Sequence, residues 1–141
     1  MKEKTTGELC AELGSTSSIA SFLQRNQEYF CPQNSAEILK ELILRKKIRK
    51  ALLAERAGIS GVYLYQILAG QRTPSRSRLI CLCIGLALSL EETQEVLKQS
   101  GQAVLYARSK RDAVIIYGII NHLKLAEIND LLFDAGAESL N

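Results

Sequence analysis

The side chains that most often carry metal or acid–base chemistry are scattered in this 141-residue sequence. Its cysteines are Cys10, Cys31, Cys81 and Cys83, and its one histidine is His122. Two cysteines stand alone, and the side chains of the C-x-C pair would diverge by about 200° on a helix, so none has the spacing of zinc ligands. No Ser/His/Asp or Cys/His arrangement is apparent either. We therefore expect no metal, no cofactor and no catalytic residues, and we interpret the protein as not being an enzyme.

The basic side chains are concentrated in the middle of the chain. The net charge of the whole sequence is +3, but residues 40–80 hold ten cations and two anions, whereas residues 1–39 carry −2 and residues 81–141 carry −3. A basic segment between acidic flanks is the pattern expected of a surface that meets phosphates. A solvated basic surface without a partner would have the same composition, so charge alone leaves both interpretations open.

The composition favours packed helices. Hydrophobic residues make up 47% of the sequence and aromatic residues only 6%, whereas strands use β-branched and aromatic side chains more heavily. No apolar run approaches the ~20 residues that cross a bilayer, and the first residues carry acids where a signal peptide is apolar. We therefore expect an all-α protein of the cytoplasm, with reduced cysteines and no membrane partner.

Apolar periodicity and capping residues divide the chain into helices. Residues 1–16 are polar and are predicted to be frayed, and the proline of Cys31–Pro32 is predicted to end the first helix. Glycines are predicted to stop several of the later helices, because they adopt the left-handed conformation at helix ends. The predicted helices span residues 17–30, 35–46, 49–57, 61–69, 76–86 and 90–100, a segment that begins after Ser109, and 125–135.

An internal repeat lies in the second half of the chain. Residues 75–106 align without gaps on residues 110–141, at an offset of 35, with nine identities in 32 positions. A leucine-rich chain would give about two or three by chance. The identical pairs are Arg76/Arg111, Ile80/Ile115, Ile84/Ile119, Leu88/Leu123, Leu90/Leu125, Glu92/Glu127, Leu97/Leu132, Gly101/Gly136 and Leu105/Leu140. Each copy has the pattern of a helical hairpin, and we expect the two hairpins to stack on their apolar faces.

The segment LLAERAGISGVYLYQILAGQRTPS, residues 52–75, has the pattern of two short helices joined by a tight turn. Ala54 is small where two helices must approach each other closely. Gly58 supplies the backbone freedom that the turn requires, and Ile59 follows it as an apolar plug between the helices. The segment is therefore predicted to be a helix-turn-helix.

Residues 36–100 resemble the lambda-repressor-like, or Xre-type, helix-turn-helix family. The resemblance rests on "LAERAGIS" at the turn, "YLYQI" in the following helix, the "GQRTPS" loop and "LALSLEE" at the entry of the fifth helix. It implies a five-helix DNA-binding domain. The all-α chain adds to this domain an N-terminal helix and a C-terminal αα-hairpin that repeats helices 4 and 5, both outside the family's core pattern. The predicted domains are 1–35, an arm with a short helix; 36–101, the helix-turn-helix domain; and 102–141, the C-terminal hairpin.

The resemblance also implies that the helix at residues 61–69 enters the major groove. The candidates for base contacts are Gly61, Val62, Tyr65 and Gln66. Gln66 is the strongest, since a carboxamide can form a bidentate pair with adenine, and Tyr65 could meet a phosphate or a thymine methyl group. Gly61 and Val62 stand where the family often has polar side chains, so few direct hydrogen bonds to base edges are expected.

The candidates for phosphate contacts lie on either side of this helix in sequence. The family usually begins the preceding helix with Ser-Gln, whereas this chain has Arg49–Lys50, which loses the cap and keeps positive charge. Cations at the start of the helix that follows Ser75 oppose the helix dipole unless an anion is present. Tyr63 could contact the backbone or simply pack. The full set is Lys46, Lys47, Arg49, Lys50, Tyr63, Arg72, Arg76 and Arg78.

The function that the resemblance implies is sequence-specific binding of double-stranded DNA by a bacterial or phage-type transcriptional regulator. Such proteins normally bind as homodimers, and the leucine-rich hairpins of residues 79–135 or the N-terminal helix are the candidate dimer surfaces. The alternative is a helix-turn-helix scaffold reused as a protein-interaction adaptor, which the apolar residues of the 61–69 helix favour. No small-molecule ligand is evident from the sequence.

Overall fold

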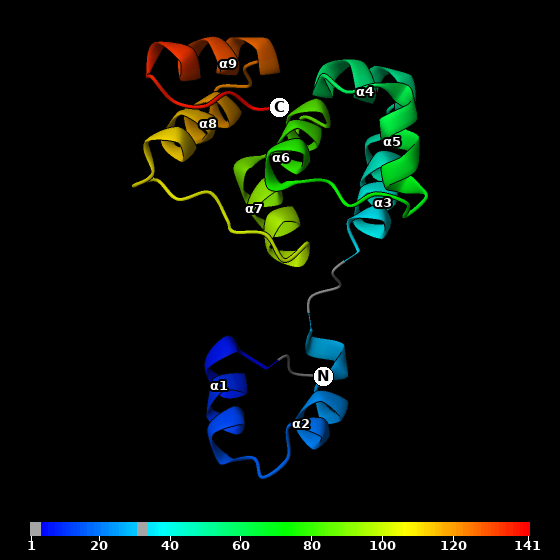
Figure 1. The fold of residues 1–141 in the computed structure, drawn as a ribbon, viewed down its shortest axis with the longest axis vertical. Coiled ribbons are helices and arrows are strands. Elements are labelled where there is room, and N and C mark those ends of the chain that lie inside the picture. Colours follow the sequence, from blue (N-terminus) through cyan, green and yellow to red (C-terminus); the bar gives the residue numbers. More distant parts are fainter. Residues whose placement is uncertain (1–3, 31–33) are drawn as a thin grey trace. The chain divides into compact units, whose positions relative to one another are not determined.

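The computed structural model describes residues 4–30 and 34–141, and every regular element within these residues is helical. The helices run from α1 to α9 in chain order, with one short 3-10 turn, η1 (Figure 1). They fall into two compact units, Met1–Cys31 and Pro32–Asn141. The all-α expectation is confirmed. The helix stop predicted at Cys31–Pro32 lies outside the described residues, and the domain boundaries predicted at 35/36 and 101/102 stay predictions.

The first unit begins with a helix where the sequence predicted fraying. Helix α1 spans Thr6–Ser15, and a capping box precedes it: the Thr5 hydroxyl accepts from the Glu8 N–H, and the Glu8 carboxylate accepts from the Thr5 N–H, both at 3.1 Å. This box satisfies two backbone donors and offsets the helix-weakening glycines of the segment. Helix α2, Ile19–Arg25, is shorter than predicted and is followed by η1, Gln27–Tyr29.

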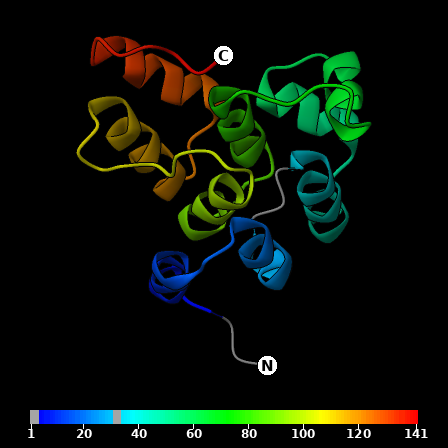
Figure 2. The same cartoon turned by 60° about the horizontal axis from the view of Figure 1, so that its bottom comes forward.

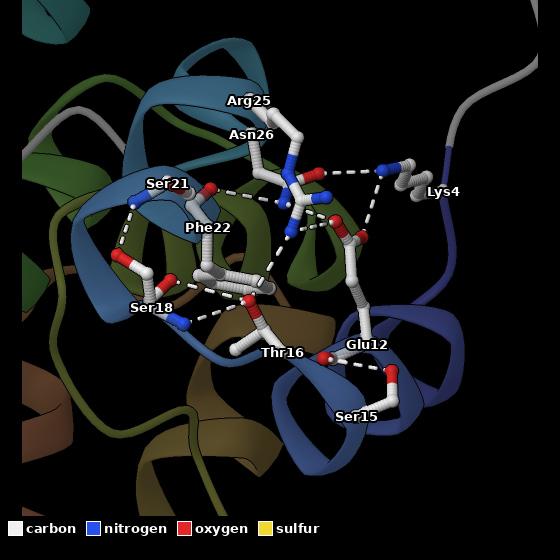
Figure 3. Close-up of polar contacts among 9 residues, drawn as sticks. All are labelled: Lys4, Glu12, Ser15, Thr16, Ser18, Ser21, Phe22, Arg25 and Asn26. Carbon is white, nitrogen blue, oxygen red and sulfur yellow. Dashed lines mark hydrogen bonds and ion pairs between the residues drawn. The ribbon is translucent and has the colours of Figure 1, made fainter.

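A polar network joins α1 to α2 (Figure 3). The Lys4 Nζ donates to Glu12 Oε2 at 2.9 Å and to Asn26 Oδ1 at 2.7 Å, and the buried Asn26 amide donates in turn to Glu12 Oε1 at 3.2 Å. The hydrogen bonds from Lys4 and Asn26 hold the pKa of Glu12 below its ordinary value. Phe22 is the one buried apolar side chain among residues 4–30, so polar contacts contribute much of what holds this unit together.

The second unit begins with a compact three-helix arrangement. Helix α3 spans Ser35–Lys46, α4 spans Lys50–Ala57 and α5 spans Gly61–Leu68. Asn34 caps α3 and Ser60 caps α5, and Lys47 takes the left-handed conformation at the end of α3, with φ 54°. Gly58 ends α4 with φ 67°, which a side chain would strain, and so makes the sharp turn into α5.

Two helical hairpins complete this unit. The first consists of α6, Arg76–Gly85, and α7, Leu90–Gln99; the second consists of α8, Lys110–Ile120, and α9, Leu125–Asp134. Helix α9 runs beside α6, and α8 runs beside α7 (Figures 1 and 2). Helix α4 packs closely on α6 at Gly85, where an added Cβ would lie 3.3 Å from the backbone of α4. The α6–α7 hairpin therefore connects the helix-turn-helix to the C-terminal hairpin.

The two hairpins repeat each other in hydrogen bonding as well as in sequence. The Gln94 side chain accepts from the Leu105 N–H at 2.7 Å and donates to the Leu105 carbonyl at 2.8 Å. The equivalent Asn129 side chain makes the same two bonds to Leu140, at 2.7 and 3.2 Å. Each second helix thus ties down the chain that follows it through one amide side chain, and the predicted repeat is a structural one.

Candidate nucleic-acid interface

The exposed face of α5 carries the residues predicted to meet bases. Val62 is 69% exposed and Tyr65 is 66% exposed, whereas Gln66 is half-buried. Gly61 is exposed, and a Cβ added there would meet nothing within 4 Å. The opposite face of the helix is fixed in the core by Leu64, Ile67 and Leu68, all buried. The structure therefore places Gly61, Val62 and Tyr65 at the surface and Gln66 partly so, on a helix whose rotation is set by its buried side.

Tyr63 holds two arginines beside α5. The Arg72 guanidinium lies 5.8 Å from the centre of the Tyr63 ring, and the Arg78 guanidinium lies 5.7 Å from it. A cation at this distance from a ring face is attracted by the ring's negative charge distribution. Both arginines are thereby held next to the start of α6, which Ser75 caps. The phosphate contact predicted for Tyr63 stays a prediction, but its visible role is to position these two cations.

Arg76 has a different environment from the one that the sequence suggested. Its guanidinium donates to both carboxylate oxygens of Asp112, at 3.3 and 2.9 Å, and to the carbonyls of Ala103 and Val104 at 2.8 and 3.2 Å. The anion expected near the start of α6 is therefore supplied by α8 of the same chain. Arg76 links the two hairpins, and we leave it out of the phosphate-binding set.

A second group of cations surrounds the start of α4. An open depression of about 420 Å³ lies there, lined by basic and apolar residues. Its lining comprises Lys46, Lys47, Ile48, Arg49, Leu52, Arg56, Leu86 and Ala87. Arg49 stands at the N-cap of α4 but makes no capping bond, so the first N–H groups of this helix lack a side-chain acceptor.

Two features of this cation group were not foreseen in the sequence. Arg56 lines the depression with Arg49, because residues seven apart share one face of a helix. Lys46 forms a partly exposed ion pair with Glu92, at 3.5 Å. A hydrogen bond from the Ser89 backbone N–H, helped by the charge of Lys46, holds the pKa of Glu92 below its ordinary value. Among the described residues, Lys46 is thus the one member of this group that forms an ion pair.

The remaining candidate chemistry is sparse. Residues 4–30 and 34–141 contain no group of three or more side chains able to hold a metal ion. Cys81 and Cys83 are buried, and burial raises the pKa of these thiols to about 11 and about 12, so both stay protonated near neutral pH. None of the helices described is both long enough and apolar enough to span a bilayer.

The arrangement of α3 to α7 is that of a helix-turn-helix domain, with α5 in the place of the second helix of the motif. Residues 39–92 match the family model described as "Helix-turn-helix". They form a helix-turn-helix domain of the Xre, or lambda-repressor-like, family, whose members are DNA-binding transcription regulators. Comparison with curated proteins and with solved structures gave no match.

Proposed function

We propose that this protein binds double-stranded DNA at a specific sequence and thereby regulates transcription. The observation that carries the proposal is that α5 exposes one face, Gly61, Val62 and Tyr65, beside two arginines held on its own Tyr63. A helix of this kind fits the major groove, and cations next to it would meet the sugar-phosphate strands. This arrangement supports a base-reading surface and a backbone-binding surface on one motif.

The start of α4 is the proposed binding site for a DNA phosphate. Its N-terminal N–H groups have no side-chain cap, and Lys47, Arg49 and Lys50 stand around it. An anion there would accept from the N–H groups and be favoured by the helix dipole. The usual capping residue would compete for these donors, so the replacement of a cap by cations agrees with a phosphate as the missing partner.

Base recognition on α5 would rest on few polar groups. Gln66 can form a bidentate pair with adenine, and Val62 and Tyr65 can contact the methyl group of thymine. We propose that this face prefers A·T-containing sites and that phosphate contacts supply most of the affinity. Because one short helix reads only a few base pairs, we also propose that two chains act together as a homodimer at a two-fold site, in the cytoplasm.

The test is selection of bound duplexes from a random pool, followed by affinity measurements on the selected site. Gln66→Ala is expected to relax site preference, whereas Lys50→Ala is expected to weaken binding to all duplexes alike. Lys98→Ala, which removes an exposed cation of α7, is the matched control and is expected to change neither. If Gln66→Ala and Lys50→Ala both leave duplex affinity and preference unchanged, the proposal is wrong.

A second function is favoured by the same exposed apolar side chains. Val62 and Tyr65 would also suit a protein partner, so the domain could act as an interaction adaptor. An adaptor would select no duplex from the pool. It would also lose affinity for its protein partner on Val62→Ser and Tyr65→Ser, while Lys50→Ala would leave that affinity unchanged.

A further inference from the structure

The two C-terminal hairpins contact each other in the reciprocal manner of a two-fold interface. Arg76 of the first copy donates to Asp112 of the second, and Arg111 of the second donates to the Ser77 hydroxyl of the first at 3.1 Å. Residues 77 and 112 are equivalent positions at the repeat offset of 35. A two-fold interface has this property: each partner gives the same contact that it receives. The inner faces of the hairpins are therefore already occupied and are not available to a second chain.

The outer face of the second hairpin exposes two large apolar side chains of α8. On α6, the positions Cys81, Leu82 and Gly85 are buried, and α4 packs on this helix at Gly85. The equivalent positions on α8 are Ile116, which is partly buried against the core, and Tyr117 and Ile120. Tyr117 and Ile120 are each 57% exposed. A helix thus packs at this end of α6 in one copy, whereas the equivalent end of α8 presents exposed apolar side chains.

We propose that this α8 stripe, defined as Ala113, Ile116, Tyr117 and Ile120, is the surface through which two copies of the chain form a dimer. This inference rests on the proposed function, which has two chains bound at a two-fold DNA site. It adds the surface that would join those two chains. The stripe follows the spacing i, i+3, i+4, i+7, which lies on one face of a helix.

The stripe is complementary to itself. A two-fold axis between Ile116 and Tyr117 pairs these two residues across antiparallel helices, and it places the small Ala113 of one chain opposite the large Ile120 of the other. Small residues opposite large ones let two helices interlock closely. The antiparallel arrangement also aligns the helix dipoles favourably. A partner of another kind would have to match this pattern, whereas a second copy does so by symmetry.

Charge supports the same occupant. Residues 113–121 contain no acidic or basic side chain, so their burial against another copy desolvates no charge. For the same reason the stripe is unsuited to DNA, which would require cations. The other pair of exposed large apolar side chains three residues apart in residues 34–141 is Val62 and Tyr65 on α5, which the DNA proposal already uses.

The first experiment measures the dimer dissociation constant of the full chain by sedimentation. Wild type is expected to dimerise, and Ile120→Glu is expected to weaken the dimer by about tenfold or more, because a carboxylate would be buried unpaired. Tyr117→Ser tests the stripe without introducing a charge and should weaken the dimer in the same direction. Phe133→Glu, on an 82% exposed residue of α9 outside the stripe, is the control and should leave the dimer unchanged. Circular dichroism verifies that each variant is folded.

The second experiment tests the two-fold register. Ala113→Lys should also weaken the dimer. The equivalent position of the first hairpin is Arg78, so this position of the repeat accommodates a long cation there. When Ala113→Lys and Ile120→Glu chains are mixed, the new lysine and glutamate face each other across the axis, and the mixed dimer should recover most of the lost affinity. A mixture that stays monomeric while wild type dimerises would overturn the proposed pairing.

Failure of this inference can be separated from failure of the DNA proposal. Wild type that stays monomeric up to about 100 μM, or Ile120→Glu that dimerises as wild type does, overturns the α8 interface. A short duplex carrying one half-site is then the separate readout, since its binding needs one chain only. If the chain binds that duplex but forms no dimer, the DNA proposal stands and the α8 interface is wrong. If the chain dimerises but binds no duplex, the α8 interface stands and the DNA proposal is wrong.

Discussion

The α6–α7 and α8–α9 hairpins have the same pattern and different surroundings. Both end their second helix at a glycine with a positive φ, and both fix the following chain through one amide side chain. They differ at the last residue of the first helix, which is Gly85 in one and Ile120 in the other. The glycine lets α4 approach, and the isoleucine faces solvent. Local sequence thus sets the shape of a hairpin, whereas the size of the last side chain of its first helix decides whether another helix can pack there.

The largest effect is expected from removing this difference. Gly85→Ile would place a side chain against Leu53 and the backbone of α4, so we expect a loss of about 3 kcal/mol in the free energy of unfolding. The reciprocal change, Ile120→Gly, should cost about 1 kcal/mol or less, since it loses only helix propensity and a half-exposed side chain. Urea unfolding measures both. Equal losses in the free energy of unfolding for the two variants would show that the packing of α4 at Gly85 is not what distinguishes the hairpins.

An intermediate effect is expected at the two equivalent arginines. Arg76→Ala leaves the buried Asp112 carboxylate without its guanidinium partner, and we expect it to cost about 2 kcal/mol. Arg111→Ala loses bonds to two carbonyls and a hydroxyl, all neutral acceptors, and should cost about 1 kcal/mol. The same unfolding measurement compares them. An Arg111→Ala loss as large as that of Arg76→Ala would contradict the view that Asp112 makes the difference.

The smallest effect is expected at the capping glutamates of α7 and α9. Glu92 accepts from the Ser89 N–H at 3.0 Å and has a lowered pKa, so its contribution is present above the ordinary carboxyl pKa and is lost as the pH falls through the lowered value. Glu92→Gln should therefore cost about 0.5 kcal/mol near neutral pH, and nothing at a pH below that lowered value. Glu127→Gln is the matched variant, with a 3.2 Å bond to the Lys124 N–H. A Glu92→Gln deficit that grows on acidification would refute this assignment.

The helix caps, the turn and the repeat could be predicted from the sequence because each depends on residues close together in the chain. Asn34, Gly58 and Ser60 stand where their types predict. The prediction of fraying was wrong for the described residues 4–16, because the Thr5–Glu8 capping box outweighs the glycines nearby. A helix near the N-terminus could therefore be predicted if both the capping box and the glycines are weighed.

The environment of Arg76 could not be predicted, because it depends on a partner 36 positions away along the chain. The sequence indicated an anion near the start of α6 but not that Asp112 of the same chain supplies it. The stacking of two arginines on Tyr63 also depends on the path of the loop at residues 70–75, which local patterns do not fix. Contacts between distant segments are thus where sequence reasoning about the candidate site was incomplete.

The most direct test of DNA binding is the salt dependence of affinity for the selected duplex. If the cations around α4 and Tyr63 each neutralise a phosphate, the slope of log affinity against log salt concentration should be roughly −5 for the wild-type chain, and Lys50→Ala should make it shallower by about one. An affinity that stays unchanged as salt rises, in wild type and variant alike, would contradict the assignment of this basic surface to DNA.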